Sequence, residues 1–446
     1  MVIPEMRIGF IFPSSEYLFD PFKGDPHTHF QILTVLESRF GGEVELCLPD
    51  LRGIKREFAV YHIPECDIYL HSVYTLDWEE QISIVRELRE KYPAAKHVAG
   101  GPHATVFQQE TLKHFDALVI GDGEEQVISL ITDLKSNKLK KIYEEKNIID
   151  INKYPFPKRH FLPKATIARK GLMTLKNKKG FDQLLGTTVI FSRGCPFECY
   201  FCAMPKVKEY CKGVRYRKPE FVKEEIEYLK KEYKLQGISL LDEIGVPYGK
   251  EQAIKHLEAI GSTNITWRGQ CRADGITPEI AELLKNSGCV TMCLGVESAS
   301  QVSLDIINKK INVEKAKEAI KLLESKGIEC RVYMIIGLPG EPENIVDLTW
   351  EFIQETKPAS VYLSILTVRP GTVLFDDPKK FGMKNIGTDW SKTMHMYGRY
   401  KEEIPSLTFE YDAVNPWGGK GMTREQIVAN YLELQSRLHK AGISRL

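Results

Sequence analysis

Three cysteines, Cys195, Cys199 and Cys202, stand at C-x3-C-x2-C spacing within eight residues, directly after an apolar run. Thiolates are ligands of zinc and of iron–sulfur clusters, and three that share one loop can hold one metal group together. Four cysteines would close every iron of a cubane cluster, whereas three leave one iron open to an outside ligand. The spacing therefore predicts an iron–sulfur cluster with one open iron.

Two other interpretations of the three cysteines were weighed against this one. A tetrahedral zinc site needs a fourth Cys or His at similarly short spacing, and the nearest candidate, Cys211, lies nine residues on with Lys and Tyr between. Three unrelated free cysteines do not explain why a loop with Gly194, Pro196 and three aromatic residues gathers them, since the other cysteines are scattered. The cluster remains the favoured interpretation.

The cysteine spacing, with the aromatic Phe201 just before the last cysteine, resembles the motif of the radical S-adenosylmethionine (SAM) superfamily. The resemblance implies a 4Fe-4S cluster on Cys195, Cys199 and Cys202 whose open iron is chelated by the amino and carboxylate groups of SAM. It also implies that an electron from the cluster cleaves SAM to a 5′-deoxyadenosyl radical.

Composition bounds the class of protein. The chain of 446 residues exceeds what one core usually serves, so two or three domains are expected. With 61 basic against 60 acidic residues, the formal net charge of +1 favours neither nucleic acid nor an anionic membrane as partner. No apolar run approaches the ~20 residues of a membrane span. Ten cysteines, three of them clustered, fit a reducing compartment. We therefore expect a soluble cytoplasmic protein.

Residues 1–140 alternate between apolar strand-like runs and amphipathic stretches, which predicts an α/β domain with a parallel sheet wound on both faces. Ligands of such sheets bind at the carboxyl ends of the strands. The expected strands are residues 6–12, 43–47, 66–72, 97–99 and 117–120, and the expected helices are 28–40 and 78–91.

Three loops at the expected strand ends, residues 71–75, 100–105 and 121–125, carry polar side chains, and the last two also contain two glycines each. Glycine lets the backbone approach a large ligand, and hydroxyl groups supply hydrogen bonds. In this order, the loops resemble the Rossmann-like cobalamin-binding domain that precedes the radical SAM domain in one subgroup. The resemblance assigns cobalamin contacts to Ser72, Thr75, Gly100, Gly101, Pro102, His103, Gly121, Gly123 and Glu124.

The domain lacks the Asp-x-His-x-x-Gly pattern that supplies a histidine lower ligand in other cobalamin proteins. The nearest approach, Asp25-Pro26-His27, runs on to Phe30 where Gly is required. The resemblance therefore implies cobalamin with its own base displaced and no protein ligand below cobalt. His103 as an axial ligand is the alternative, and Asp122 departs from the Glu usual in the subgroup.

A linker is expected over residues 141–185, because residues 154–163 contain three prolines. Residues 186–375 alternate again and predict a partial (β/α)6 barrel, open on one side, with its site at the strand carboxyl ends. The expected strands are 187–191, 237–242, 265–271, 290–296, 329–336 and 360–366, and the helices are 220–233, 250–260, 278–287, 313–325 and 343–355.

Polar residues at the ends of these strands are the expected SAM contacts. The resemblance gives Asp242 and Glu243 to the SAM ammonium, Arg272 to its carboxylate, Glu297 to a ribose hydroxyl or the ammonium, and Gly337 to the adenine. Gln270 and Ser298 belong to the same strand ends. The alternative is a structural ion-pair network of Arg272, Asp274 and Glu297, because buried charges need partners.

Residues 376–446 are expected to form a small, mostly helical C-terminal region with a helix over residues 423–440. Its aromatic residues and methionines belong either to the core of a small cap or to the wall of a substrate pocket; they are Trp390, Met394, Met396, Tyr397, Tyr400 and Trp417.

The resemblance implies a radical methyltransferase that moves a methyl group from SAM, via methylcobalamin, to an unactivated carbon of a small-molecule or peptide substrate. An external reductase, flavodoxin or ferredoxin would supply electrons. The cofactors carry such chemistry, so no catalytic side chain is nominated. Two alternatives stay open: a cobalamin-dependent cyclase or ring-rearranging enzyme, and a cobalamin or iron–sulfur binding protein that acts as sensor or carrier.

Overall fold

The computed structural model describes residues 4–16, 18, 20–145, 147–173, 180–211, 213–388 and 407–443. It divides into an N-terminal unit, Met1–Ile167 with Val207–Gly213, and a C-terminal unit, Ala168–Lys206 with Val214–Leu446. The division after Ile167 falls inside the segment expected to be a linker. The assignment of residues 207–213 to the N-terminal unit has no counterpart in the sequence pattern.

The N-terminal unit is built on six parallel strands in the order β2-β1-β3-β4-β5-β6. The expected Rossmann-like sheet is confirmed, and the ends of its predicted strands and helices shift by at most two residues. The strands are β1 (Met6–Ile11), β2 (Val44–Cys47), β3 (Ile68–Ser72), β4 (Lys96–Gly100), β5 (Ala117–Ile120) and β6 (Ile142–Glu144). The edge strand β6 was not expected, because three residues are too short to show a period.

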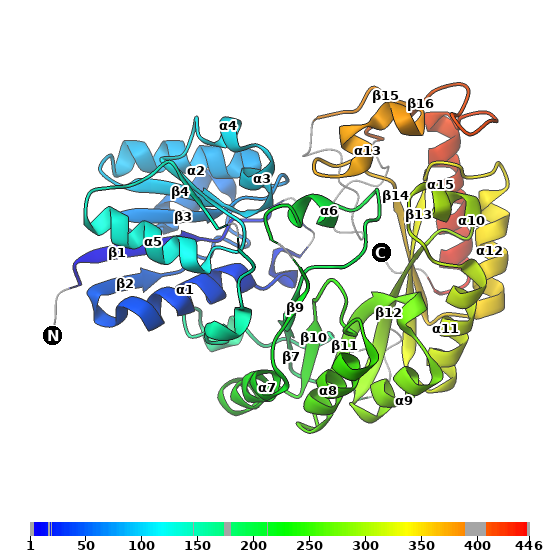
Figure 1. The fold of residues 1–446 in the computed structure, drawn as a ribbon, viewed down its shortest axis with the longest axis horizontal. Coiled ribbons are helices and arrows are strands. Elements are labelled where there is room, and N and C mark those ends of the chain that lie inside the picture. The colour runs from blue at the N-terminus through cyan, green and yellow to red at the C-terminus, as the bar shows by residue number, and fades with distance from the viewer. Residues whose placement is uncertain are drawn as a thin grey trace. The chain divides into compact units, whose positions relative to one another are not determined.

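Helices cover both faces of this sheet (Figure 1). Helix α1 (His27–Phe40) packs against α5 (Glu124–Lys135) on one face, and α2 (Trp78–Lys91) lies on the other. The strand order reverses between β1 and β3, so the loops after these two strands leave the sheet in opposite directions. In open α/β sheets, ligands bind at the carboxyl ends of the strands beside such a reversal.

The C-terminal unit is built on an open sheet of six parallel strands in the order β14-β13-β12-β11-β10-β7. The expected partial barrel is confirmed, again with ends shifted by at most two residues. The strands are β7 (Gly186–Val189), β10 (Gly237–Leu240), β11 (Thr266–Arg272), β12 (Cys289–Glu297), β13 (Glu329–Ile336) and β14 (Ser360–Ile365). Helices α7 (Pro219–Tyr233), α8 (Lys250–Gly261), α9 (Pro278–Asn286), α11 (Val313–Ser325) and α12 (Ile345–Thr356) form a row along one face of the sheet.

Strand β11 shows which side chains face these helices. The indole N–H of Trp267 donates to the carbonyl and hydroxyl oxygens of Ser287, which caps α9, at 3.0 Å each. Because side chains alternate along a strand, Arg268, Gln270 and Arg272 point to the opposite face. We call that opposite face the inner face of the sheet.

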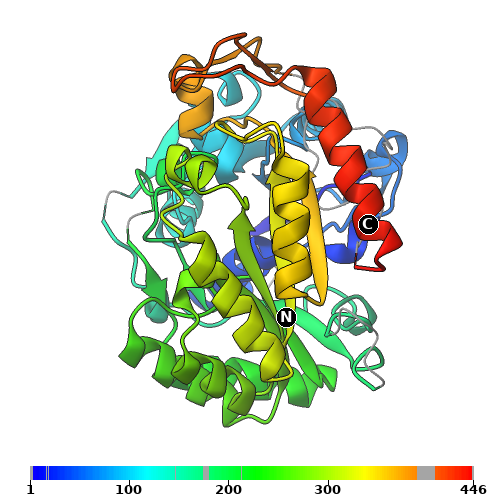
Figure 2. The same ribbon diagram turned by 90° about the vertical axis from the view of Figure 1, so that its right-hand side faces the viewer.

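The C-terminal region contains the expected tail helix, α15 (Arg424–Lys440), which begins with a capping box between Thr423 and Gln426. It lies beside α12 and β14, as Figure 2 shows in red and yellow. Of the expected cap or pocket residues, Trp390, Met394, Met396, Tyr397 and Tyr400 lie outside the described residues. Among the described helices, none has both the length and the apolar character needed to cross a bilayer.

Glycine at position 101 is required by the backbone of the N-terminal unit. Its φ is +88°, and an added Cβ would lie 2.9 Å from both the N and the O of Val73. We expect Gly101→Ala to lower the free energy of unfolding by about 2 kcal/mol or more, because strain and close contact combine. Thermal unfolding followed by circular dichroism measures this. The control is Gly42→Ala, where an added Cβ meets nothing within 4 Å; equal melting temperatures for the two variants would contradict the expectation.

Candidate functional site

The cysteine loop leaves the carboxyl end of β7 and begins with Gly194 at φ +89°. A short antiparallel pair, β8 (Ser192–Arg193) with β9 (Arg215–Tyr216), closes its base. Cys199 is buried, whereas Cys195 and Cys202 are partly exposed. The loop therefore presents one inner thiol and two that are open to an incoming group.

Other elements fix the backbone of this loop. The turn after α10 (Gln301–Ile306) holds it twice: the Tyr200 N–H donates to the Ile307 carbonyl at 2.9 Å, and the Asn308 side-chain amide donates to the Glu198 carbonyl at 2.8 Å. The Tyr200 carbonyl accepts from the Leu374 N–H at 3.2 Å. None of these three bonds uses a thiol, so the cysteine side chains are not needed for them.

The side chain of Arg272, at the end of β11, ties the cysteine loop to two other segments. It donates to both carboxylate oxygens of Asp274, at 3.0 and 2.9 Å, and to the Lys309 carbonyl at 2.8 Å. Its Nη1 lies 3.8 Å from the Cys199 sulfur, and its guanidinium stacks 3.6 Å from the centre of the Phe197 ring. The N–H donors of Arg272 thus already have acceptors in the protein, in segments that lie next to Cys199.

A second buried ion pair lies in the same region. The Lys309 ammonium is 2.7 Å from the Glu297 carboxylate, and it also lies 5.7 Å from the centre of the Phe201 ring. A side chain at Gly295 would meet the Glu297 carboxylate at 2.5 Å, so this pair needs glycine there. Instead of one network of Arg272, Asp274 and Glu297, the structure has two separate ion pairs, Arg272 with Asp274 and Lys309 with Glu297. The sequence pattern did not indicate the role of Lys309.

These cations suit an anionic group on the cysteines. Burial raises the pKa of the Cys199 thiol, and the nearby Lys309 and Arg272 act in the opposite direction. Iron–sulfur clusters carry negative charge on their sulfurs and are tuned by hydrogen bonds to them. Within the described residues, no three His, Cys, Asp or Glu side chains are grouped as metal ligands, so the cluster on Cys195, Cys199 and Cys202 stays a prediction.

Asp242, at the end of β10, is buried and only half engaged. Its Oδ1 accepts from the backbone N–H groups of Phe191 and Ser192, and its Oδ2 has no partner in the described structure. The Gln270 amide donates to the Asp242 carbonyl at 3.0 Å, whereas the neighbouring Glu243 is exposed. Burial raises the pKa of the Asp242 carboxyl to about 8. An unpaired buried carboxylate oxygen suits an ammonium ligand.

The Gly337 loop follows β13 and has φ +90° at the glycine. The Gly337 N–H donates to the Glu341 carboxylate and its carbonyl accepts from the Tyr411 hydroxyl, both at 2.8 Å. Ser298 is buried and accepts from the Ser300 N–H at 3.1 Å. Tyr411 links this loop to the C-terminal region, a contact that no sequence pattern indicated.

In the N-terminal unit, the loops after β3 and β4 pack tightly together. Gly101 lies against Val73, and its added Cβ would lie 3.2 Å from the Ser72 hydroxyl. The His103 ring stacks on Trp78 with centroids 4.3 Å apart, and its Nδ1 lies 3.2 Å from the Thr75 hydroxyl.

His103 is buried, and its Nε2 has no partner in the described structure. Burial lowers the pKa of His103 to about 4, so the ring is neutral at physiological pH. Gly100 precedes the short helix α3 (Gly101–Val106), in which Pro102 stands in the first turn.

The loop after β5 carries Gly121 and Gly123 at φ +96° and +101°, ahead of the buried Glu124 that starts α5. An added Cβ at Gly121 would lie 3.3 Å from the Tyr210 carbonyl, and the Tyr210 ring packs on the core beside α2 and β5. Sequence reasoning missed Tyr210, since its segment follows the cysteine motif and shows no period.

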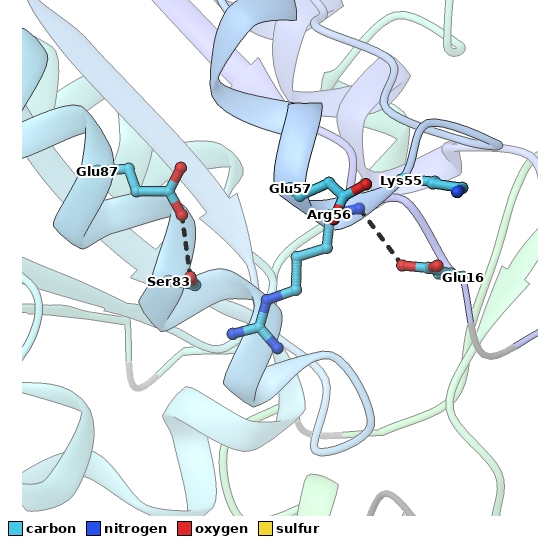
Figure 3. Close-up of a pocket in the computed structure, with 6 residues that line it drawn as sticks. All are labelled: Glu16, Lys55, Arg56, Glu57, Ser83 and Glu87. Atoms are coloured by element: carbon cyan, nitrogen blue, oxygen red, sulfur yellow. Dashed lines mark hydrogen bonds between the residues drawn. The ribbon is translucent and has the colours of Figure 1, made fainter.

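An open surface hollow of about 480 Å³ lies elsewhere on the N-terminal unit (Figure 3). The charges around it already have neighbours: the Arg56 N–H donates to Glu16, the Arg56 guanidinium to the Glu79 carbonyl, and the Ser83 hydroxyl to Glu87. It contains none of the residues expected to bind a cofactor. Its lining residues are Glu16, Lys55, Arg56, Glu57, Ser83 and Glu87.

Comparison with known sequences gives a match for the central part of the C-terminal unit. Residues 189–353 match the model of the radical SAM superfamily. An uncharacterised methyltransferase of Pyrococcus horikoshii is 30% identical over 63% of this chain and 62% of its own length. The anaerobic magnesium-protoporphyrin IX monomethyl ester cyclase of Rubrivivax gelatinosus is 27% identical over 67% of this chain and 55% of its own. The chain thus spans less than two thirds of both relatives.

Comparison with solved structures extends the likeness to both units. The radical SAM methyltransferase TsrM of Kitasatospora setae, solved with cobalamin and a [4Fe-4S] cluster, matches with a TM-score of 0.71 at 14% identity. The match covers 99% of this chain and 91% of TsrM. The fold of the present chain is therefore similar to that of TsrM.

The raised pKa of Asp242 predicts a pH-dependent stability of the ligand-free protein. Between about pH 4 and pH 8, the folded protein keeps a proton on Asp242 that the unfolded chain releases, so the free energy of unfolding falls as the pH rises. Asn cannot ionise. Asp242→Asn should therefore gain stability over the wild type across this range, by at most about 1.4 kcal/mol per pH unit.

Urea unfolding at several pH values measures this difference, with Glu220→Gln as the control for an exposed carboxylate. A constant loss of stability in Asp242→Asn at every pH would show that the carboxyl is ionised throughout.

Proposed function

We propose that this chain is a cobalamin-dependent radical SAM methyltransferase, because residues 189–353 match the model of the radical SAM superfamily and the fold is similar to that of TsrM. It would move a methyl group from SAM to an unactivated carbon of a small-molecule or peptide substrate. The observation that carries this proposal is the gathering, at the strand carboxyl ends of an open barrel, of a three-cysteine loop, buried cations beside Cys199, and the unpaired Oδ2 of Asp242.

The residues of the C-terminal unit would divide the binding of cluster and SAM. Cys195, Cys199 and Cys202 would hold the 4Fe-4S cluster, with Arg272 beside the Cys199 sulfur. Asp242, through Oδ2, would accept the SAM ammonium. When bound, the cluster supplies the electron that cleaves SAM, and cobalamin relays the methyl group.

The remaining expected SAM contacts lie around these residues. Glu243, Gln270, Glu297 and Ser298 stand at neighbouring strand ends. Gly337 would let its backbone approach the adenine, since its loop is already fixed by Glu341 and Tyr411. Arg272 would reach the SAM carboxylate only by sharing or exchanging a present partner.

The N-terminal unit would hold cobalamin at the carboxyl ends of its strands. The loops after β3, β4 and β5 carry the residues assigned to it, and three glycines there, Gly101, Gly121 and Gly123, have positive φ. His103 fits the corrin edge rather than the cobalt, because it stacks on Trp78 and bonds Thr75. Its neutral Nε2 is free to serve a polar group of the ligand.

The chemistry needs no acid–base pair from the protein, since the cofactors carry it and the chain positions them. An external reductase, flavodoxin or ferredoxin would supply electrons. The clustered thiols and the need for a reduced cluster point to a cytoplasmic, reducing location.

A cobalamin-dependent cyclase or ring-rearranging enzyme is the second candidate. The likeness to the cyclase of Rubrivivax gelatinosus favours it, and both candidates use the same cofactor residues. A sensor or carrier is the third, and it would have no need of Asp242, Glu243 and Glu297 around SAM. Cleavage of SAM by the reduced protein would exclude the third candidate.

The cluster prediction is tested by changing Cys195, Cys199 and Cys202 together to Ala. After anaerobic reconstitution, the triple variant should hold almost no iron, because only these cysteines share the loop. The control is Cys211→Ala, a partly exposed cysteine outside the motif, which should keep full iron. Iron and sulfide analysis with electron paramagnetic resonance gives the readout. A full cluster in the triple variant would refute the assignment.

Methyl transfer is tested in the same preparations with methyl-labelled SAM and candidate substrates. Mass spectrometry should find the label on a substrate carbon with the wild type and not with the triple variant. A product that has lost hydrogen or gained a ring, and carries no label, would favour the cyclase.

The cobalamin prediction is tested with His103→Ala. Cobalamin should still bind, and the Co(II) spectrum should show no nitrogen superhyperfine splitting in either protein, since neither a histidine nor the cofactor's own base is bound below cobalt. His62→Ala, at an exposed histidine, is the control. Splitting in the wild type that disappears only in His103→Ala would make His103 an axial ligand.

A further inference from the structure

The inner face of the C-terminal sheet carries polar side chains not only at the carboxyl ends of the strands but also several residues before those ends. The strand register places these side chains in neighbouring rows: Arg268 is level with Thr291 and Glu329, Gln270 with Cys293 and Arg331, and Tyr333 with Tyr362. Packed cores are normally apolar, so a buried polar face is informative. At its lower end, the carbonyls of Leu172 and Met173 accept from Arg268 and Thr291, and the other polar side chains of the face suit a polar ligand.

Two arginines on this face form no ion pair with any described carboxylate. Arg268 donates only to neutral acceptors, the Leu172 carbonyl at 3.0 Å and the Cys293 sulfur at 3.4 Å. Arg331 is 7% exposed; its Nε donates to the Ser360 hydroxyl at 3.3 Å, and its guanidinium lies over the ring of Tyr362. Within the part of the chain that the structure describes, neither arginine pairs with a carboxylate.

The nearest acid on the face does not neutralise them. Glu329 is buried and accepts from the Thr291 hydroxyl at 3.5 Å, and it forms no ion pair with Arg268 or Arg331 among the described residues. The cations nearer the cluster loop differ, since Arg272 pairs with Asp274 and Lys309 with Glu297. A buried charge without a partner is costly, so the two lower arginines fit a site that a ligand completes.

We propose that Arg268 and Arg331 bind an anionic group of the substrate, a carboxylate or a phosphate, on the inner face of the sheet. The proposal rests on the function proposed above and names its substrate class. Guanidinium groups bind both anions through paired N–H donors. The two arginines stand on β11 and β13 with β12 between them, and Arg331 lies two residues nearer the strand ends than Arg268, so their Cα atoms are about 12 Å apart.

The SAM carboxylate is not this anion. Arg268 precedes Arg272 by four residues on β11, which is about 13 Å along the strand, away from the carboxyl end where Arg272 meets Cys199. A group held at the open iron of the cluster would lie at that end. The lower arginines therefore anchor a second molecule that extends down the inner face.

The test measures anion binding by the reconstituted protein in the presence of saturating SAM. The probes are inorganic phosphate and propionate, with propionamide as the uncharged match of propionate and chloride to keep the ionic strength constant. Wild-type protein should bind phosphate or propionate and should ignore propionamide. Arg268→Gln and Arg331→Gln should each bind roughly tenfold more weakly or worse. Phosphate and propionate, compared directly, show which anion the site prefers.

Two variants keep the experiment decisive. Arg437→Gln is the matched control, because Arg437 is an arginine of α15 paired with Asp347 and Glu433, and it should bind as the wild type does. Arg331→Lys keeps the positive charge but loses the paired N–H donors of the guanidinium. Its affinity for the anion should lie between that of the wild type and that of Arg331→Gln.

Without anion, the two Gln variants should melt no lower than the wild type, since each removes an unpaired charge. Lower melting of both would mean that the arginines are structural and would overturn the proposal. Equal anion affinity in the wild type and all variants would also overturn the proposal, and so would anion binding that occurs only without SAM. Failure of the wild type to hold a cluster or cleave SAM would instead refute the proposed function and leave the anion measurement readable.

Discussion

The guanidinium of Arg272 is the contact on which the candidate site depends. It joins the end of β11, the cysteine loop and the turn that follows α10, three segments that are far apart in the sequence. Its Nε and Nη2 donate to the two carboxylate oxygens of Asp274, and its Nη1 faces the Cys199 sulfur. A lysine would carry the same charge without this geometry. One planar side chain therefore contacts the loop, the strand and the turn, in addition to the backbone bonds that hold the loop.

The sequence predicted the fold well where its signals were local or periodic. The strands and helices of both sheets follow hydrophobic periods, and the cysteine motif lies within eight residues. Prediction from the sequence failed where a side chain contacts residues that are distant in the chain. Lys309 lies in a turn without a period, yet it neutralises Glu297 because Gly295 leaves room between them. Tyr210 was missed because it contacts the distant Gly121, and the edge strand β6 was missed because its three residues show no period.

Asp242 illustrates the limit for the site itself. Its place at the end of a strand indicated a ligand-binding carboxylate, but not that one oxygen is bound to the backbone of Phe191 and Ser192. That division gives the side chain two tasks. Oδ1 ties the start of the cysteine loop to β10, and Oδ2 remains for a ligand. Only the folded arrangement of two neighbouring strands reveals this.

The backbone bonds of the cysteine loop have a consequence for how this segment tolerates substitution. Ile307, Asn308 and Leu374 hold the loop through amide and carbonyl groups alone. The conformational entropy of ordering the loop is therefore offset by bonds that belong to the folded backbone. Since none of these bonds uses a thiol, the cysteine side chains can be replaced without removing the bonds that shape the loop.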